Sequence, residues 1–267
     1  MGEKRRVLWV WVFLGLVLSP GIRAQSAPPA SGTLFQFALF EALLSGNFDG
    51  RMPIAELQRH GDFGIGAFDR LGGELILLDG KLYQAKADGK VYQPSPQALT
   101  PYAFACRFAG GAAREIPNGT TMESLQGLLD QAAANPHLFY AFRVSGFFNK
   151  VRTRTVPEQS RPYTSLLEAV KGQVVAEFDR VPGTLLGFRC PPYVQGINYP
   201  GYHFHFISED RQKGGHLFAC EMESGQVRIM TMSRYELALP EDPTAFQNVQ
   251  YGKDRMQEMR RILSDRK

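Results

Sequence analysis

The chain has 267 residues, of which 44% are hydrophobic and 21% are charged, and its formal net charge is +4. This length and composition exclude an intrinsically disordered chain and allow one large domain or two small ones. Residues 1–24 hold four basic residues and one acidic residue, so the rest carries only about +1 of the +4. No basic stripe remains, which argues against nucleic acid or acidic lipid as partners.

The first 24 residues have the pattern of a secretory signal peptide. Basic residues 4–6 precede an apolar run over residues 7–18, and small residues then lead to a cleavage site after Ala24. The run is shorter than the roughly 20 apolar residues of a membrane-spanning helix. We therefore expect an exported protein, secreted or periplasmic, without stable membrane association once the leader is removed. An uncleaved anchor is the alternative, and residues 25–32 predict a flexible lead-in.

The following hundred residues predict a mixture of strands and helices. Residues 34–44 are dense in apolar side chains and indicate a strand followed by a helix. Asp-Gly pairs separate three short apolar runs, and this pattern predicts a three-stranded meander because both turn residues tolerate positive φ. Residues 121–134 predict a helix with a threonine at its cap and Asn135-Pro136 at its end. The three runs of the meander are residues 74–78, 81–85 and 90–93.

The second half of the chain is predicted to be mainly β-strand. Ser145-Gly146 separates the first two of its strands, residues 164–171 indicate a short helix, and residues 254–261 indicate a charged terminal helix. One disulfide among Cys106, Cys190 and Cys220 is allowed in an exported protein, but buried thiols fit this sparse set better. The predicted strands are residues 138–144, 147–156, 184–188, 202–207, 216–222 and 226–232.

Three of the 5 histidines lie within one short segment. His203 and His205 alternate with phenylalanines, so in a strand both imidazoles point to one face and the phenyl rings to the other. Residues 210–215 are turn-like, and His216 begins the returning strand of a hairpin. Three imidazoles that converge from two paired strands are typical of a Zn²⁺ site that leaves a coordination position open.

Four ordered blocks of the sequence resemble the acetolactate decarboxylase family, and together they cover nearly all of the mature chain. They are LFQFALFEALLSGNFDG, GDFGIGAFDRLGGELILLDGKLYQ, VRTRTVPEQSRPY, and GYHFHFIS followed by GGHLF. The resemblance implies that His203, His205 and His216 bind Zn²⁺. It also implies that Glu74 is an active-site carboxylate close to the metal and that Arg154 is the active-site arginine.

The activity that the resemblance implies is the decarboxylation of (S)-2-acetolactate (2-hydroxy-2-methyl-3-oxobutanoate) to (R)-acetoin and CO₂. The metal would act as the electron sink without an organic cofactor, and the enzyme would be a homodimer. One departure concerns a glutamate that the family carries close to its C-terminus. Leu263 stands there in this chain, with Glu258 and Asp265 as acidic neighbours.

The expected fold class is α+β, with two β-rich modules and a metal site in the cleft between them. One module is a mixed or antiparallel sheet, and the other is a small β-barrel-like sheet. We place an N-terminal α+β sheet domain at residues 33–145. A C-terminal β-rich metal-binding domain with a terminal helix would occupy residues 146–267.

The same residues also allow other interpretations, with a different ligand set or without a catalytic role. In a cupin-like metal enzyme Glu209 would join the histidines as a ligand, with Fe²⁺ as the metal. In an exported module with structural zinc, a cysteine or a carboxylate would close the fourth position. Glu74 could open a solvated edge strand, and Arg154 could belong to a basic strand face with Lys150 and Arg152.

Overall fold

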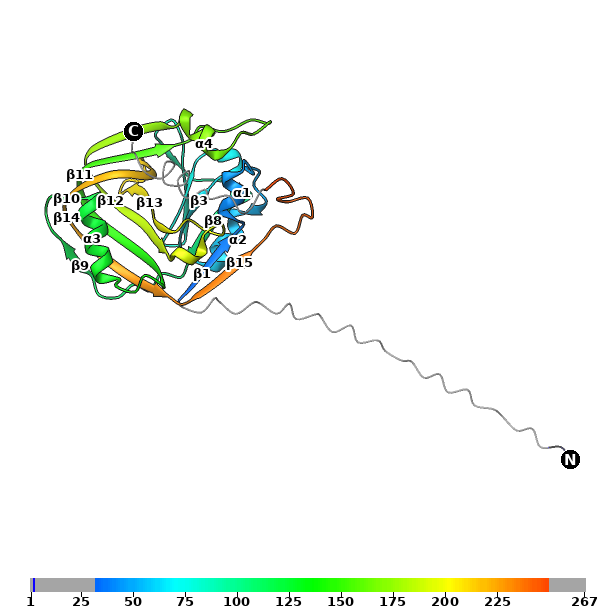
Figure 1. Ribbon diagram of the computed structural model, residues 1–267, viewed down its shortest axis with the longest axis horizontal. Coiled ribbons are helices and arrows are strands. Elements are labelled where there is room, and N and C mark those ends of the chain that lie inside the picture. Colours follow the sequence, from blue (N-terminus) through cyan, green and yellow to red (C-terminus); the bar gives the residue numbers. More distant parts are fainter. Residues whose placement is uncertain (1, 3–31, 250–267) are drawn as a thin grey trace.

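The computed structural model describes Gly2 and residues 32–249. Outside the described residues lie the predicted signal peptide apart from Gly2, residues 25–31 of the lead-in, the terminal helix at residues 254–261, and Leu263. Within them the fold is β-rich with few helices, as expected, and consists of two main sheets packed against each other (Figure 1). No helix in the described part of the chain is long and apolar enough to span a membrane.

The first sheet has seven strands in the order β15-β1-β8-β3-β4-β5-β6. It is mixed, because β1 and β15 run parallel while the other neighbours are antiparallel. The predicted meander is confirmed as β4, β5 and β6, and Asp79 and Gly80 turn between the first two with φ of 51° and 73°. The strands are β1 (Thr33–Phe37), β3 (Phe63–Ala67), β4 (Glu74–Leu78), β5 (Lys81–Ala85), β6 (Val91–Tyr92), β8 (Tyr102–Cys106) and β15 (Arg234–Ala238). A separate pair joins β2 (Met52–Pro53) to β7 (Leu99–Thr100).

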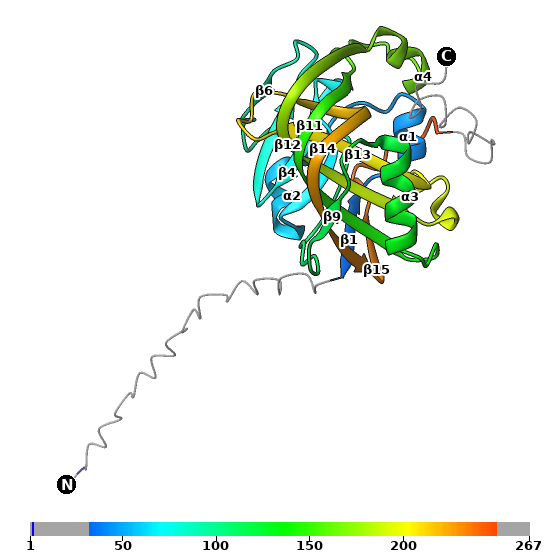
Figure 2. The same ribbon diagram turned by 90° about the vertical axis from the view of Figure 1, so that its left-hand side faces the viewer.

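The second sheet has six strands and is barrel-like. Because β13 pairs with β12 and also with β14, the strands β11, β12, β13 and β14 close into a ring. Figure 2 shows β11, β12 and β14 as long, strongly curved ribbons. The strands are β9 (Arg114–Ile116), β10 (Thr120–Thr121), β11 (Phe139–Thr155), β12 (Val174–Cys190), β13 (Gly201–Ser208) and β14 (Gly214–Met232).

Two predicted strand breaks are wrong. Ser145-Gly146 makes no turn, and the chain does not break between residues 222 and 226, because β11 and β14 run on as single strands of 17 and 19 residues. Gly146 lies opposite Gly183 on one neighbouring strand and Gly225 on the other. A Cβ atom at Gly146 would come within 2.1 Å of the Ser224 carbonyl oxygen, so glycine serves close approach of backbones here rather than a turn.

The helices are short and cover the sheets at few places. The predicted helix after residue 120 is confirmed as α3, where the Thr121 side chain accepts from the Ser124 backbone N–H and the Ser124 hydroxyl accepts from the Thr121 N–H. The helices are α1 (Phe40–Leu44), α2 (Ile54–His60), α3 (Met122–Ala132) and α4 (Leu166–Ala169), with 3₁₀ turns η1 (Asp69–Leu71), η2 (Val170–Gly172) and η3 (Pro192–Val194).

The main hydrophobic core lies between the two sheets. Ile76 and Phe104 of the seven-stranded sheet belong to one buried cluster with Leu186 and Phe188 of the six-stranded sheet. A second cluster packs the other face of the six-stranded sheet against α3, and a third lies beneath α2. The three cysteines are buried free thiols, as the sequence analysis favoured. The predicted domain division stays a prediction. Its boundary after residue 145 falls inside β11. In addition, β15 from the C-terminal half of the chain joins the sheet of the N-terminal half.

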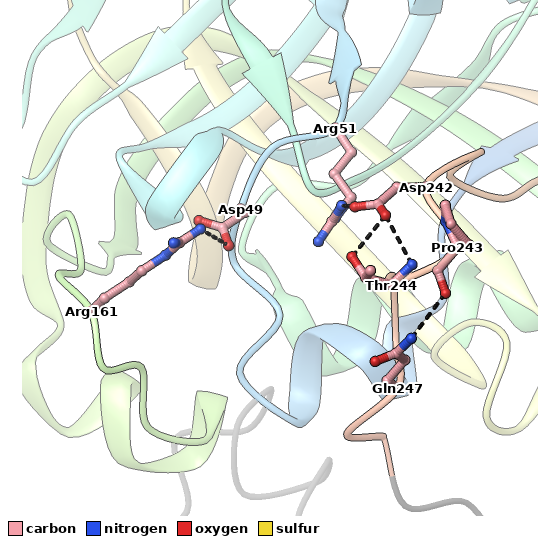
Figure 3. Close-up of polar contacts among 7 residues, drawn as sticks. All are labelled: Asp49, Arg51, Arg161, Asp242, Pro243, Thr244 and Gln247. Carbon is pink, nitrogen blue, oxygen red and sulfur yellow. Dashed lines mark hydrogen bonds and ion pairs between the residues drawn. The ribbon is translucent and has the colours of Figure 1, made fainter.

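Residues 46–51 connect α1 to β2 and are tied to two distant parts of the chain (Figure 3). Asp49 accepts a hydrogen bond from Arg161 at 2.6 Å. It also accepts one from the Tyr163 hydroxyl at 2.8 Å. Arg51 forms an ion pair with Asp242. Burial by itself would raise the pKa of Asp49, but the hydrogen bonds from Arg161 and Tyr163 outweigh it, so this pKa lies below its ordinary value.

Candidate active site

The three histidines of the predicted metal site come together on one face of the six-stranded sheet. His205 on β13 lies directly opposite His216 on β14, and His203 is two residues away on the same face. The three ring centroids are 4.9–5.4 Å apart, and one potential ligand atom from each ring lies within 4.8 Å of the others. Phe204 and Phe206 pack into the core on the other face, as the alternation predicted.

All three imidazoles are held in their neutral form. Burial, with His205 and Arg154 nearby, lowers the pKa of His203 well below its ordinary value. Burial lowers the pKa of His205 to about 3, although its hydrogen bond to the Leu75 carbonyl acts in the opposite direction. Burial and the Arg154 charge also lower the pKa of His216. Neutral imidazole is the form that binds metal ions, because a lone pair must be available on one nitrogen.

The hydrogen bonding of His203 and His205 fits a metal ion. His205 Nδ1 lies 3.0 Å from the Leu75 carbonyl oxygen, which can only accept, so Nδ1 carries the proton and Nε2 keeps its lone pair. His205 Nε2 and both ring nitrogens of His203 are buried without a hydrogen-bond partner in the described chain. Buried polar atoms normally have a hydrogen-bond partner, so these nitrogens are free to bind a metal ion. The donor set therefore suits Zn²⁺, which accepts imidazole nitrogen as a ligand.

Glu74 reaches the same site from the seven-stranded sheet. It is the first residue of β4, and its Oε2 lies 3.4 Å from His205 Nε2. Burial raises the pKa of Glu74 to about 7, although the charge of Arg154 lowers it. With 17% of its side chain exposed, Glu74 does not belong to a solvated edge strand.

The turn before Glu74 is strained. Arg70 and Leu71 both have positive φ, 55° and 56°, which costs about 1–2 kcal/mol for each residue that carries a Cβ. The Arg70 N–H donates to the Phe48 carbonyl at 2.7 Å, and the Gln159 N–H donates to the Arg70 carbonyl at 2.7 Å. These contacts hold Leu71 in the wall of the pocket, three residues ahead of Glu74.

Arg154 approaches the histidines from β11, where it lies directly opposite His216. Only 5% of its surface is exposed, and its Nη2 donates to His216 Nε2 at 3.3 Å. Its neighbours in the predicted basic face differ, because Lys150 is exposed and Arg152 pairs with Glu177 at 2.9 Å. The structure thus separates Arg154 from a solvated basic face.

All five predicted site residues line one pocket. Its polar side chains are the three imidazoles, Glu74, Arg154 and Tyr102, whose hydroxyl donates to Asn198, and most of the remaining wall is apolar. Both sheets, the helices α1 and α4, and the turns η1 and η2 contribute to that wall, which no local sequence pattern indicated. The larger apolar side chains are Phe40, Leu43, Leu71, Val156, Leu166 and Val170.

The residues of the competing interpretations lie elsewhere. Glu209 is exposed in the turn after β13 and is outside the histidine group. Cys106, Cys190 and Cys220 are also outside that group, which is the one cluster of potential metal ligands among residues 32–249. Neither a cupin-like ligand set nor a cysteine-closed zinc site is therefore supported.

Known proteins match this chain over nearly all of its described residues. The family model for alpha-acetolactate decarboxylase matches residues 34–252. The chain is 41% identical over 233 residues to alpha-acetolactate decarboxylase from Methanosarcina mazei, covering 87% of this chain and 81% of that protein. It is 37% identical over 236 residues to the Bacillus subtilis strain 168 protein of the same name, covering 87% and 92% of the two chains. The crystal structure of alpha-acetolactate decarboxylase from Bacillus subtilis strain 168 superposes with a TM-score of 0.84 at 35% identity, covering 87% of this chain and 100% of that one.

Proposed function

The chain belongs to the alpha-acetolactate decarboxylase family and is a carboxy-lyase, and on that premise we propose that it uses Zn²⁺ to convert (S)-2-acetolactate to (R)-acetoin and CO₂. The observation that carries the zinc proposal is the group of three neutral imidazoles, with His205 and His216 buried and His203 partly buried, beside Glu74 and Arg154. Three protein ligands are typical of a catalytic rather than a structural zinc site.

His203, His205 and His216 would hold the ion. Bound there, Zn²⁺ would supply a Lewis acid for the oxygen on which negative charge develops. Its three ligands are neutral, so they would leave its charge undiminished. The Leu75 carbonyl keeps the His205 ring in the ligand tautomer, and Leu75 is the residue next to Glu74 in β4. The seven-stranded sheet therefore helps to orient a ligand that the six-stranded sheet carries.

Arg154 is proposed to orient the substrate carboxylate before the bond breaks. When CO₂ leaves this β-keto acid, the electron pair of the broken C–C bond moves onto the ketone oxygen and gives an enediolate. The planar guanidinium stays charged at every relevant pH and offers several N–H donors in a fixed arrangement. The same donors would assist the later protonation of carbon, directly or through a water molecule.

Glu74 is proposed to hydrogen-bond the substrate hydroxyl or to relay the proton that carbon receives. Its carboxylate faces His205 from the opposite sheet, so it reaches the substrate from a direction different from that of Arg154. Two polar groups on different sides of a small substrate fix which face of the enediolate is protonated. This arrangement supports a single acetoin enantiomer as product.

The apolar wall of the pocket suits the two methyl groups of acetolactate. Few polar side chains besides the five site residues line the pocket, so little water would be held near the reacting carbon. Exclusion of water strengthens the interactions of Arg154 and Glu74 with the developing charge.

The proposal is tested with purified protein by metal analysis and by measuring acetoin and CO₂ released from racemic acetolactate. We expect about one zinc per chain, loss of activity with a chelator and recovery when Zn²⁺ is added back. Activity that survives complete removal of metal would overturn the zinc proposal while leaving the decarboxylase assignment intact. Absence of acetoin from the metal-loaded protein would overturn the proposed function itself.

We also propose that the protein is exported and that it forms a homodimer. Both rest on the sequence, because residues 1–24 carry the signal pattern and the family resemblance implies the dimer. N-terminal sequencing of the exported protein should begin at Gln25. Light scattering should give twice the mass of the mature chain, and a monomeric mass at micromolar concentration would contradict the dimer.

A further inference from the structure

Arg154 contacts two residues that lie outside the predicted site. Besides its hydrogen bond to His216, its Nη1 donates to the Gln173 side-chain oxygen at 3.1 Å. Its guanidinium carbon lies 5.0 Å from the centre of the Phe218 ring. A planar guanidinium needs two restraints to be fixed, one on the orientation of its plane and one on rotation within that plane.

Gln173 connects Arg154 to the helical segment that forms part of the pocket wall. It follows η2 directly and precedes β12, and its backbone N–H donates to the Val170 carbonyl at 3.1 Å. Val170 and Leu166 line the pocket from this helical segment. The amide oxygen of Gln173 therefore fixes one arm of the guanidinium relative to the wall that encloses the substrate.

Phe218 owes its position to an irregularity in β14. Arg152 pairs with Ala219 and Thr153 pairs with Leu217, so Phe218 is the extra residue of a β-bulge. Bulges re-aim a side chain and are frequent beside active sites. Here the bulge lies two residues beyond His216, and the Phe218 ring faces the Arg154 guanidinium. Face contact between an aromatic ring and a guanidinium is attractive and orients the plane of the cation.

We propose that Gln173 and Phe218 are positioning residues for decarboxylation, which act through Arg154. The Phe218 ring sets the plane of the guanidinium, and the Gln173 oxygen sets its rotation within that plane. Together they determine which N–H groups of Arg154 point at the substrate. The inference rests on the role proposed above for Arg154. On this view the bulge in β14 serves to place the Phe218 ring against the Arg154 guanidinium.

The test compares variants that remove one contact with variants that keep it. Gln173→Met preserves the shape of the side chain but lacks the acceptor, whereas Gln173→Glu keeps an acceptor oxygen. Phe218→Leu removes the aromatic face, whereas Phe218→Tyr keeps it. Phe147→Leu is the matched control, because Phe147 lies outside the pocket and its ring contacts Arg180 in the same sheet at 5.5 Å.

Each variant is measured for kcat, KM, enantiomeric excess of acetoin, zinc content and thermal midpoint. Gln173→Met should lose about tenfold or more in kcat, because it removes a hydrogen bond to a charged group. Phe218→Leu should lose about threefold to tenfold, the range expected for a partly buried cation–π contact. Gln173→Glu, Phe218→Tyr and Phe147→Leu should stay within about twofold to threefold of wild type. Zinc content should not change in any of them.

A second comparison separates positioning from a structural role. In an Arg154→Lys background, which has no planar guanidinium, Gln173→Met and Phe218→Leu should cause no further loss of kcat. The inference would be overturned if the variants lost kcat equally in the wild-type and Arg154→Lys backgrounds. It would also be overturned if the loss of kcat tracked a fall in the thermal midpoint. If wild-type protein makes acetoin but these variants match it, the inference fails and the proposed function stands. If wild type makes none, the proposed function has failed first.

Discussion

Replacing Gly187 with alanine should damage the proposed zinc site from the opposite face of the sheet. Gly187 on β12 lies directly across from Phe204 on β13. A Cβ atom at position 187 would come within 1.9 Å of one ring carbon of Phe204 and 2.2 Å of another. Phe204 is 2% exposed, and the rings of Phe142 and Tyr202 lie 6.4 Å and 5.7 Å from it. The Phe204 ring therefore has little room to move away.

The magnitude follows from this overlap. An ordinary carbon contact is about 3.5–4.0 Å, so the ring or the strand must shift by about 1.5–2 Å. Overpacking of this kind costs about 1–3 kcal/mol of unfolding free energy, which corresponds to a fall of about 2–12 °C in the thermal midpoint. Because Phe204 lies between His203 and His205, the shift also displaces ligand side chains. We expect zinc affinity to fall by about tenfold to a hundredfold, as when supporting contacts of metal ligands are lost.

The assay is thermal unfolding of the metal-free protein together with zinc competition against a chromophoric chelator. Gly127→Ala is the matched control, because Gly127 lies in α3 with no atom within 4 Å of its added Cβ. That substitution should stabilise the protein by about 0.5–1 kcal/mol, through better helix propensity. A Gly187→Ala protein that unfolds at the wild-type temperature and binds zinc equally well would refute the packing argument.

Three further predictions concern polar residues. Arg154→Ala should retain zinc but lose about 10²–10³-fold in turnover, whereas His205→Ala should lose both zinc and turnover; metal analysis and acetoin assays decide. Glu74→Gln should lower the enantiomeric excess of acetoin, measured by chiral chromatography, and an unchanged excess would remove Glu74 from protonation. Asp49→Asn should destabilise the protein at pH 7, because the Arg161 and Tyr163 contacts favour the carboxylate and lower its pKa from 3.8. Because this pKa is depressed, Asp49 stabilises the fold above pH 3.8, and this stabilisation is lost as the pH falls below that value. The difference in unfolding free energy between variant and wild type, measured with urea, should therefore shrink below pH 3.8. A difference that stays constant with pH would contradict this.

Much of the local structure follows from the sequence. The alternation of histidine with phenylalanine predicts which side chains of β13 share a face, since the period of a strand is two whatever lies around it. The Asp-Gly turns predict the β4–β5–β6 meander, because positive φ is a property of those residues themselves. The cap at Thr121 predicts the start of α3 in the same way.

The same local reasoning fails for glycine, which can either form a turn or allow neighbouring backbones to approach closely. Gly146 looks like a turn residue, yet it lies within β11 opposite Gly183 and Gly225, where three backbones meet closely. Only the neighbouring strands show that the missing side chain provides space rather than conformational freedom. The continuity of β11 and β14, and with it the closed ring of strands, is decided at that level.

The sequence by itself determined that three imidazoles would converge from one hairpin, because the turn and the strand period act over fourteen residues. Only the tertiary structure brought Glu74 within 3.4 Å of His205, placed Gln173 and Phe218 against Arg154, and enclosed the group in an apolar pocket. These contacts join residues that are far apart in the chain or that a bulge has re-aimed. Their geometry depends on how two sheets pack, and no local preference of the residues involved encodes it.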